Sequence, residues 1–230
     1  MGLRHSPKIV TDGLVLCLDA ANAKSYPGSG TTWYDLSNNG NDSALTNGPT
    51  FSGDDKGVIV FDGVNDYVLK SSFPFSFTSE SFSINFWLNV TNQIPNYGIC
   101  ICGAGPFNLG GMGLEIRIQT ALLECTINDG VSSGIRTQLS SACSTNEWNN
   151  FYFTFDRNSL SAKIYKNSIL RTTRSYSGET SSVSTYDLRI GRGNDRYLNG
   201  KISNFSIYNR ALSDSEVRQN YQALRGRYGI

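Results

Sequence analysis

Residues 200–224, GKISNFSIYNRALSDSEVRQNYQAL, run from a strand pattern directly into a helix signature. Phe205 and Ile207 alternate with polar residues, as is typical of a β-strand. Ser213 and Glu216 then form a capping box, in which each side chain bonds the backbone of the other residue, and apolar residues follow at helical spacing. We therefore expect one short helix to close an otherwise β-rich chain.

Outward from this stretch, alternation of apolar and polar residues dominates the chain. It is clearest over Phe82–Val90, which predicts a strand with one face buried. Ile202 is out of phase with the apolar residues after it, so we expect a β-bulge near Ser203. The same reasoning predicts strands at Leu14–Leu18, Val58–Phe61, Tyr67–Lys70, Leu114–Ile118, Leu122–Ile127, Phe151–Phe155, Leu160–Lys166 and Leu188–Ile190.

The connections between these strands indicate the fold class. They contain turn signals such as Asn47-Gly48-Pro49 and Asp62-Gly63, and no helix pattern lies between the strands. This excludes βαβ units and predicts an all-β, antiparallel two-sheet sandwich with the short C-terminal helix. No linker divides the chain, so we expect one domain over residues 11–230 after an N-terminal arm over residues 1–10.

Charge and cysteine content narrow the function classes. Lys and Arg number 20 and Asp and Glu number 19, so the formal charge of +1 gives no field to attract nucleic acid or an anionic membrane. No apolar run has the length of a signal peptide core or a membrane span, so we expect folding in a cytosol. Five cysteines, an odd number, predict free and mostly buried thiols.

Four segments together resemble the laminin-G-like jelly roll of the concanavalin A-like lectin/glucanase superfamily. They are VIVFDGVNDYV at 58–68, FSINFWLNV at 82–90, WNNFYFTFDRNSLSAKIYKNSIL at 148–170 and LRIGRGNDRYLNGKISNFSIYNRALSDSEV at 188–217. The resemblance implies a concanavalin A-like jelly roll. Ser203 and Asn204 stand where family members often carry acidic residues, so a carboxylate-dependent site there is in doubt.

The opening segment carries a narrower resemblance. Residues 9–41, IVTDGLVLCLDAANAKSYPGSGTTWYDLSNNGN, are similar to jelly-roll modules of virion structural proteins from tailed bacteriophages. This resemblance implies a virion location after synthesis in the host cytoplasm, with capsid or fibre subunits as partners and a homo-oligomeric assembly. His5 and Lys8 in the N-terminal arm are the expected assembly contacts, because an ordered arm is normally held by something.

One loop has the beginning of a calcium-binding pattern. Asp35, Ser37, Asn39 and Asn41 place oxygen ligands at alternate positions, with a glycine at the bend. Thr46 occupies the place of the bidentate glutamate that would close an EF-hand site. The loop is a candidate structural calcium site, and a plain Asx-turn is the alternative.

The residues offer little for catalysis. A glucanase needs paired carboxylates, whereas Glu115 and Glu124 fall on separate predicted strands with no acidic partner two or four residues away. The one histidine, His5, lies in the N-terminal arm, which argues against base catalysis by histidine. We predict that the chain is not an enzyme and has no catalytic residues.

Carbohydrate recognition is a stronger candidate, because it uses aromatic platforms with fixed polar groups and leaves no strict motif. The candidate residues are Trp33, Tyr97, Asn194, Asp195 and Tyr197, all in loop-like segments. We expect a non-enzymatic phage virion surface protein, a head decoration or fibre-type component, with adhesion to host surface glycans. The alternatives are a free lectin-like polysaccharide-binding module and, more remotely, a glycoside hydrolase.

Overall fold

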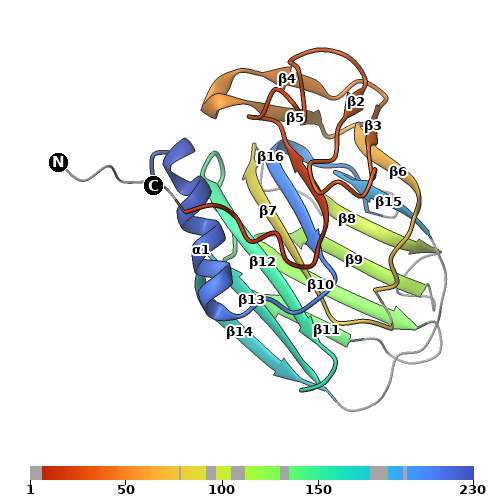
Figure 1. The fold of residues 1–230 in the computed structure, drawn as a ribbon, viewed down its shortest axis with the longest axis vertical. Helices are drawn as coiled ribbons and strands as arrows, with labels where there is room; N and C mark the ends of the chain where they lie inside the picture. The colour runs from red at the N-terminus through yellow and green to blue at the C-terminus, as the bar shows by residue number, and fades with distance from the viewer. Residues whose placement is uncertain are drawn as a thin grey trace.

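Two eight-stranded sheets packed face to face form the body of the molecule (Figure 1). The computed structural model describes residues 7–77, 79–91, 97–104, 112–129, 135–176, 186–193 and 196–230, without the side chains of 97, 100–104, 112 and 129. All the strand pairs within its sheets are antiparallel. The predicted all-β two-sheet sandwich with one C-terminal helix is confirmed.

The first sheet, sheet A, has the order β14-β13-β12-β7-β16-β5-β4, and β1 also pairs with β16. Its strands are β1 (Leu14–Asp19), β4 (Thr50–Ser52), β5 (Val58–Asp62), β7 (Phe82–Val90), β12 (Trp148–Asp156), β13 (Ser161–Lys166), β14 (Ile169–Ser175) and β16 (Asn199–Tyr208). The register of β16 against β7 shifts between Ile202 and Asn204, which confirms the predicted bulge.

The second sheet, sheet B, has the order β11-β10-β9-β8-β15-β6-β3-β2. Its strands are β2 (Thr32–Trp33), β3 (Ser43–Thr46), β6 (Tyr67–Phe73), β8 (Tyr97–Ala104), β9 (Met112–Gln119), β10 (Leu122–Asp129), β11 (Ile135–Leu139) and β15 (Tyr186–Ile190). Alternate side chains of both sheets meet in one apolar core, where Phe82, Phe153 and Phe155 from sheet A lie in the same cluster as Leu114 and Ile116 from sheet B.

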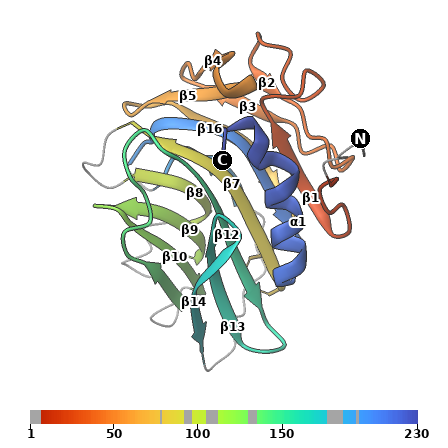
Figure 2. The same ribbon diagram turned by 90° about the vertical axis from the view of Figure 1, so that its left-hand side faces the viewer.

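The helix α1 (Asp214–Leu224) covers the face of sheet A that points away from sheet B (Figure 2). On this side the Trp87 ring of β7 stacks on Tyr228 at 4.1 Å and on Tyr221 at 5.6 Å between ring centroids. Every residue of β7 is therefore buried. The expectation that this strand has only one buried face is wrong, because the sequence pattern of a strand does not show what covers its polar side.

A row of hydrogen-bonded asparagines lies on the covered face of sheet A. Asn150 of β12 donates to Asn85 of β7 at 2.6 Å, and Asn85 donates to Asn204 of β16 at 2.8 Å. Asn204 in turn donates to the backbone carbonyl of Leu18 in β1 at 3.1 Å. These bonds give partners to most of the buried amide groups, with Asn150 Oδ1 the one oxygen of the three amides left without one, and they connect four neighbouring strands.

The helix begins as the sequence predicts. Ser213 is the N-cap, its side chain accepts from the backbone N–H of Glu216, and the Glu216 side chain bonds the Ser213 backbone.

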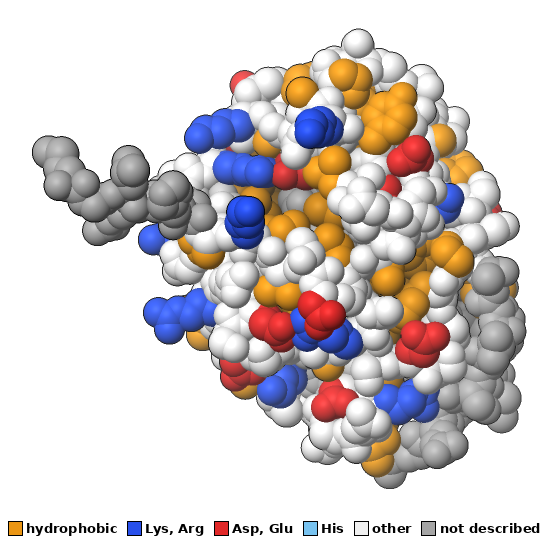
Figure 3. Space-filling view, in the orientation of Figure 1, with side chains coloured by type: hydrophobic (Ala, Val, Ile, Leu, Met, Phe, Trp, Pro, Cys, Tyr) orange, Lys and Arg blue, Asp and Glu red, His pale blue; other side chains and the backbone are white. Residues whose placement is uncertain are grey.

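None of the helices in the described ranges is long and apolar enough to span a membrane. Figure 3 shows Lys/Arg and Asp/Glu side chains interspersed over the visible face, in keeping with the net charge of +1.

Candidate ligand-binding sites

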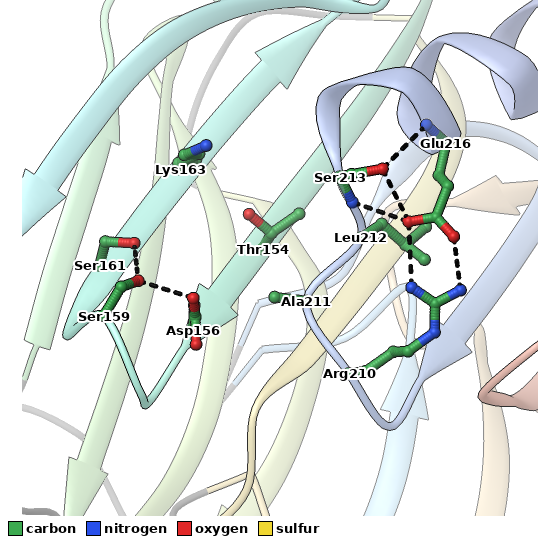
Figure 4. A pocket seen from close by; sticks show the side chains of 10 residues that line it. All are labelled: Thr154, Asp156, Ser159, Ser161, Lys163, Arg210, Ala211, Leu212, Ser213 and Glu216. Atoms are coloured by element: carbon green, nitrogen blue, oxygen red, sulfur yellow. Dashed lines mark hydrogen bonds and ion pairs between the residues drawn. The ribbon is translucent and has the colours of Figure 1, made fainter.

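A polar pocket of about 370 Å³ lies between the β12–β13 turn and the start of α1 (Figure 4). Its deepest lining residues are Thr154 and Leu212, which are buried, and the other lining side chains are more exposed. Strands β12 and β13 with their connecting turn form one wall of the pocket, and residues 210–216, which lead into α1, form the other. The lining consists of Thr154, Asp156, Ser159, Ser161, Lys163, Arg210, Ala211, Leu212, Ser213 and Glu216.

Short-range hydrogen bonds fix the wall on the β12–β13 turn. The Ser159 hydroxyl donates to Asp156 Oδ2 at 2.6 Å, and the Asn158 backbone N–H donates to Asp156 Oδ1 at 3.0 Å. Ser159 and Ser161 share a hydrogen bond at 2.9 Å. Lys163 Nζ stands on the same wall, 3.3 Å from a carboxylate oxygen of Asp214.

An ion pair fixes the opposite wall. Arg210 donates from both terminal nitrogens to the two oxygens of Glu216, at 3.0 and 2.6 Å, and its Nε lies 2.8 Å from an Asp12 carboxylate oxygen. The N–H and the hydroxyl of Ser213 both donate to Glu216 Oε2 at 2.9 Å. Bidentate geometry of this kind gives the arginine little freedom to reach another group.

The carboxylates around the pocket are held in their charged form. The hydrogen bond from Ser159 lowers the pKa of Asp156, and the hydrogen bond from the Tyr165 hydroxyl lowers that of Asp214. The hydrogen bonds from Arg210 lower the pKa of Glu216 to about 2. None of the three is a proton donor near neutral pH, so the pocket is suited to hydrogen bonding rather than to general acid catalysis.

This pocket was not predicted from the sequence. Its walls come from residues 154–163 and 210–216, which are brought together only by the packing of sheet A against the start of α1. The capping box in Ser213–Glu216 identified the helix start, but nothing in the local pattern shows that Lys163 lies next to it. Only a contact prediction between the two segments could have located the site.

A cluster of two tyrosines and an arginine lies at the loop ends of sheet B, and we call it the tyrosine platform: Tyr67, Arg192 and Tyr197. The ring centroids of the two tyrosines are 6.5 Å apart. The Arg192 guanidinium lies 5.1 Å from the Tyr67 centroid and 5.3 Å from the Tyr197 centroid. All three side chains are half-buried, so part of each reaches solvent. Apolar ring surface beside a multidentate donor is a combination that suits sugars.

The other residues predicted to bind carbohydrate do not join this platform. Trp33 is completely buried in the core, so the prediction that it offers an exposed ring is wrong. Its position in a loop-like stretch did not show that β2 pairs with β3 over the core. Asn194, Asp195 and the side chain of Tyr97 lie outside the described residues, so their roles remain predictions.

The candidate calcium loop forms a compact hydrogen-bonded turn. Oδ1 of Asp35 accepts from the backbone N–H groups of Cys17 and Ser37, and Oδ2 accepts from the Ser37 hydroxyl and the Asn41 N–H, all at 2.6–3.0 Å. Asn39 and Asn41 direct their amide groups to the carbonyls of Leu14 and Val15. Protein donors thus already occupy the Asp35 carboxylate, as in an Asx-turn. Calcium binding by Asp35, Ser37, Asn39 and Asn41 remains the alternative to this turn.

The arm residues that are described pack on their own chain. The Val10 N–H donates to Asn220 of α1 at 2.7 Å, and the Lys8 carbonyl accepts from Gln219 at 2.8 Å. Val10 is buried with Tyr208 and Val217, so the fold already includes part of the arm. The Lys8 side chain is exposed, whereas His5 lies outside the described residues. Contacts of either residue with another subunit remain predictions.

The structure brings together two acidic residues that the sequence separates. In the β9–β10 register Glu124 pairs with Arg117 and Thr126 pairs with Glu115, so the two glutamates are diagonal neighbours on one face of sheet B. Both are buried. Glu124 is bound by Arg117, Arg136 and Gln138, which occupy its carboxylate oxygens.

The comparisons with known proteins agree with this architecture. A family model described as the concanavalin A-like lectin/glucanases superfamily matches residues 62–218, which is more than half of the chain. No curated protein matches the sequence. The family match confirms the concanavalin A-like jelly roll that the four sequence segments implied.

Among solved structures, the chain is similar to receptor-binding domains of botulinum neurotoxins. The type G domain matches with a TM-score of 0.67 at 20% identity, over 92% of this chain and 51% of that one. The neurotoxin DC domain in complex with rat synaptotagmin II matches with a TM-score of 0.70 at 18% identity, over 94% of this chain and 52% of that one. The same domain in complex with SialylT matches with a TM-score of 0.72 at 20% identity, over 93% of this chain and 52% of that one. The chain spans about half of each domain, and identities this low show a shared fold alone.

Proposed function

The chain belongs to the concanavalin A-like lectin/glucanase superfamily, and from that premise we propose that it is a non-enzymatic module that binds carbohydrate. Of the neurotoxin domains with this fold, the type G domain is described as receptor-binding, and the DC domain as a binding domain in complex with rat synaptotagmin II or with SialylT. That description supports recognition as the role of the fold. It leaves the binding residues of this chain to be argued from its own geometry.

The observation that carries the proposal is the tyrosine platform. Tyr67 comes from the start of β6, and Arg192 and Tyr197 come from the connection between β15 and β16, so the ends of two paired interior strands of sheet B hold the cluster in place. Rigid aromatic rings contact the C–H face of a sugar at low entropic cost, and Arg192 adds directional donors to its hydroxyls. Tyr197 and its neighbours Asn194 and Asp195 were also predicted from the sequence as sugar-binding residues.

Glycan-array binding of the full chain tests this proposal. We expect binding to at least one bacterial surface polysaccharide, and we expect Tyr197→Ala to weaken it about tenfold through loss of the ring contact. The matched control is Tyr34→Ala, which removes another loop tyrosine that is 45% exposed and lies outside the platform. Silence across the array, or equal loss in both variants, contradicts the proposal.

A glycoside hydrolase is the competing function within the same superfamily, favoured by the diagonal pair Glu115 and Glu124. Hydrolysis requires one carboxylic acid and one carboxylate across the scissile bond. Both carboxylates are buried, and three side chains bind Glu124. Release of reducing ends from β-glucans that disappears in Glu115→Gln or Glu124→Gln would establish the hydrolase in place of the binding module.

The proposal extends to where the module acts. We place it on the surface of a bacteriophage particle, as a head decoration or fibre-type component made in the host cytoplasm and assembled with other virion proteins and further copies of itself. The support is the resemblance of residues 9–41 to virion modules of tailed phages. Quantitative mass spectrometry of purified virions tests it: a decoration protein has a fixed, high copy number, whereas a free lectin is absent from the particle.

A further inference from the structure

We infer that the polar pocket between the β12–β13 turn and α1 is a second binding site, and that its ligand is an uncharged sugar residue. The inference rests on the proposed carbohydrate-binding function but uses different residues. The pocket opens on the face of sheet A that carries α1, whereas the tyrosine platform belongs to the loops of sheet B. Each site can therefore be removed without the other.

The charges around the pocket favour a neutral ligand. Two cations line it, Lys163 and Arg210, and two carboxylates, Asp156 and Glu216. Asp214 adds a further carboxylate 3.3 Å from the lysine. An anion such as phosphate would gain from the cations but would meet at least as many negative groups nearby. A polyhydroxylated neutral molecule meets no such repulsion.

The donors and acceptors that remain open to a ligand lie on the wall formed by β12, β13 and the turn between them. Arg210 and Glu216 bind each other through both oxygens, so they act as a fixed wall rather than as ligand contacts. Lys163 has three N–H donors, of which one faces Asp214 at 3.3 Å. Asp156 accepts from the Ser159 hydroxyl and from the backbone N–H groups of Asn158 and Ser159, which leaves one of its about four lone-pair positions open.

An acceptor and a donor that line the same pocket match the hydroxyls of a sugar ring, which can donate to Asp156 and accept from Lys163. The Ser161 hydroxyl, whose one hydrogen points to Ser159, can accept from a further hydroxyl. Leu212 and Ala211 supply apolar surface for the C–H groups of the ring. The volume of about 370 Å³ is near the lower end of the usual range for ligand sites, which fits a single sugar residue rather than a long chain.

Nuclear magnetic resonance on the ¹⁵N-labelled full chain tests the inference. The probes are the methyl glycosides of glucose, galactose, mannose, fucose and N-acetylglucosamine, with glucuronate and inorganic phosphate as charged comparisons. We expect at least one neutral glycoside to shift amide signals concentrated in residues 156–163 and 210–216 in the millimolar range. We expect Lys163→Gln to weaken that binding about tenfold, as for loss of one charge-assisted hydrogen bond.

Lys201→Gln is the matched control, because Lys201 is also a lysine of sheet A. Its side chain is 30% exposed, against 34% for Lys163, and it lies 3.8 Å from a carboxylate oxygen of Asp54. The control should bind like the unmodified chain, and both variants should keep its melting temperature. Tyr197→Ala should leave the pocket signals unchanged. If Tyr197→Ala abolishes glycan-array binding while no neutral glycoside shifts the pocket amides, the proposed function stands and this inference fails. Pocket shifts with phosphate or glucuronate alone also overturn it, because the site would then select anions.

Discussion

Glu216 joins the cap of α1 to the ion pair with Arg210, so one side chain serves two local structures. It accepts from the Ser213 N–H at the helix start and from both terminal nitrogens of Arg210. These bonds favour the charged carboxylate and lower its pKa from 4.5 to about 2. A group whose pKa is lower in the folded than in the unfolded state stabilises the fold wherever the unfolded chain would also be ionised.

The stabilisation from Glu216 is therefore complete above about pH 5 and is lost as the pH falls from about 4.5 to about 2. We expect Glu216→Gln to lower the free energy of unfolding by about 1–2 kcal/mol at pH 7, allowing for solvent screening of a side chain that is 27% exposed. The difference from the unmodified chain should shrink toward pH 2. Urea unfolding at a series of pH values measures it.

Glu147→Gln provides the comparison, because Glu147 is exposed and lies outside the helix cap. Its unfolding free energy should follow that of the unmodified chain at every pH. A Glu216→Gln difference that stays constant down to pH 2 would mean that the side chain contributes through packing rather than through its charge.

Residue-level predictions from the sequence succeeded where the interaction is local. The capping box joins Ser213 and Glu216 three residues apart, so their spacing alone predicts it. The hydrogen bonds around Asp35 include partners two and six residues later, as in the Asx-turn that the sequence offered as the alternative to a calcium site. The burial of Trp33 depends on residues far along the chain, and local composition carries no sign of it.

The same division holds for elements. The bounds of β7 were predicted without error, because nine alternating residues define a strand. Short strands such as β2 and β4 contain too few residues to show a period, and the structure adds them through pairing with neighbours. That α1 covers sheet A could not be predicted, because the outward residues of β7 are asparagine, serine and tryptophan rather than an apolar stripe.

The docking of α1 and the chain end on sheet A rests on stacked aromatic rings. Tyr228 lies 4.1 Å from Trp87 and 4.8 Å from Trp148 between centroids and is 9% exposed. We expect Tyr228→Ala to lower the free energy of unfolding by about 2–4 kcal/mol, as for loss of a large buried ring. Because both neighbours are tryptophans, the near-ultraviolet circular dichroism and the tryptophan emission should change as well.

Tyr34→Ala removes a tyrosine that is 45% exposed and should change neither the stability nor the tryptophan signals by a comparable amount. If Tyr228→Ala unfolds the chain outright, Tyr228→Phe keeps the ring and should restore most of the stability. A Tyr228→Ala chain as stable as the unmodified one would show that α1 is held by the contacts of Val217 and Leu224 without the ring stack.

On the scale of the whole molecule, the two sheets share one core, and the three tryptophans lie either in that core or in the separate cluster on the outer face of sheet A. Trp33 is buried on the β2–β3 edge, whereas Trp87 and Trp148 lie under the end of the chain. Since one apolar cluster connects strands from both sheets among the described residues, we expect the sandwich to unfold as one unit. We expect tryptophan emission and far-ultraviolet circular dichroism to give coincident unfolding curves.

Thermal unfolding followed with the same probes, in calcium and in a chelator, decides whether the Asp35 loop binds a cation. A calcium ion that binds only the folded state raises the melting temperature by mass action, so its removal lowers it. Because protein donors already occupy both oxygens of Asp35, we expect the melting temperature to be equal in calcium and in a chelator. A lower melting temperature in the chelator that Asp35→Asn abolishes would instead establish structural calcium, with Asp35, Ser37, Asn39 and Asn41 as its ligands. Two separate transitions in either condition would contradict the single core.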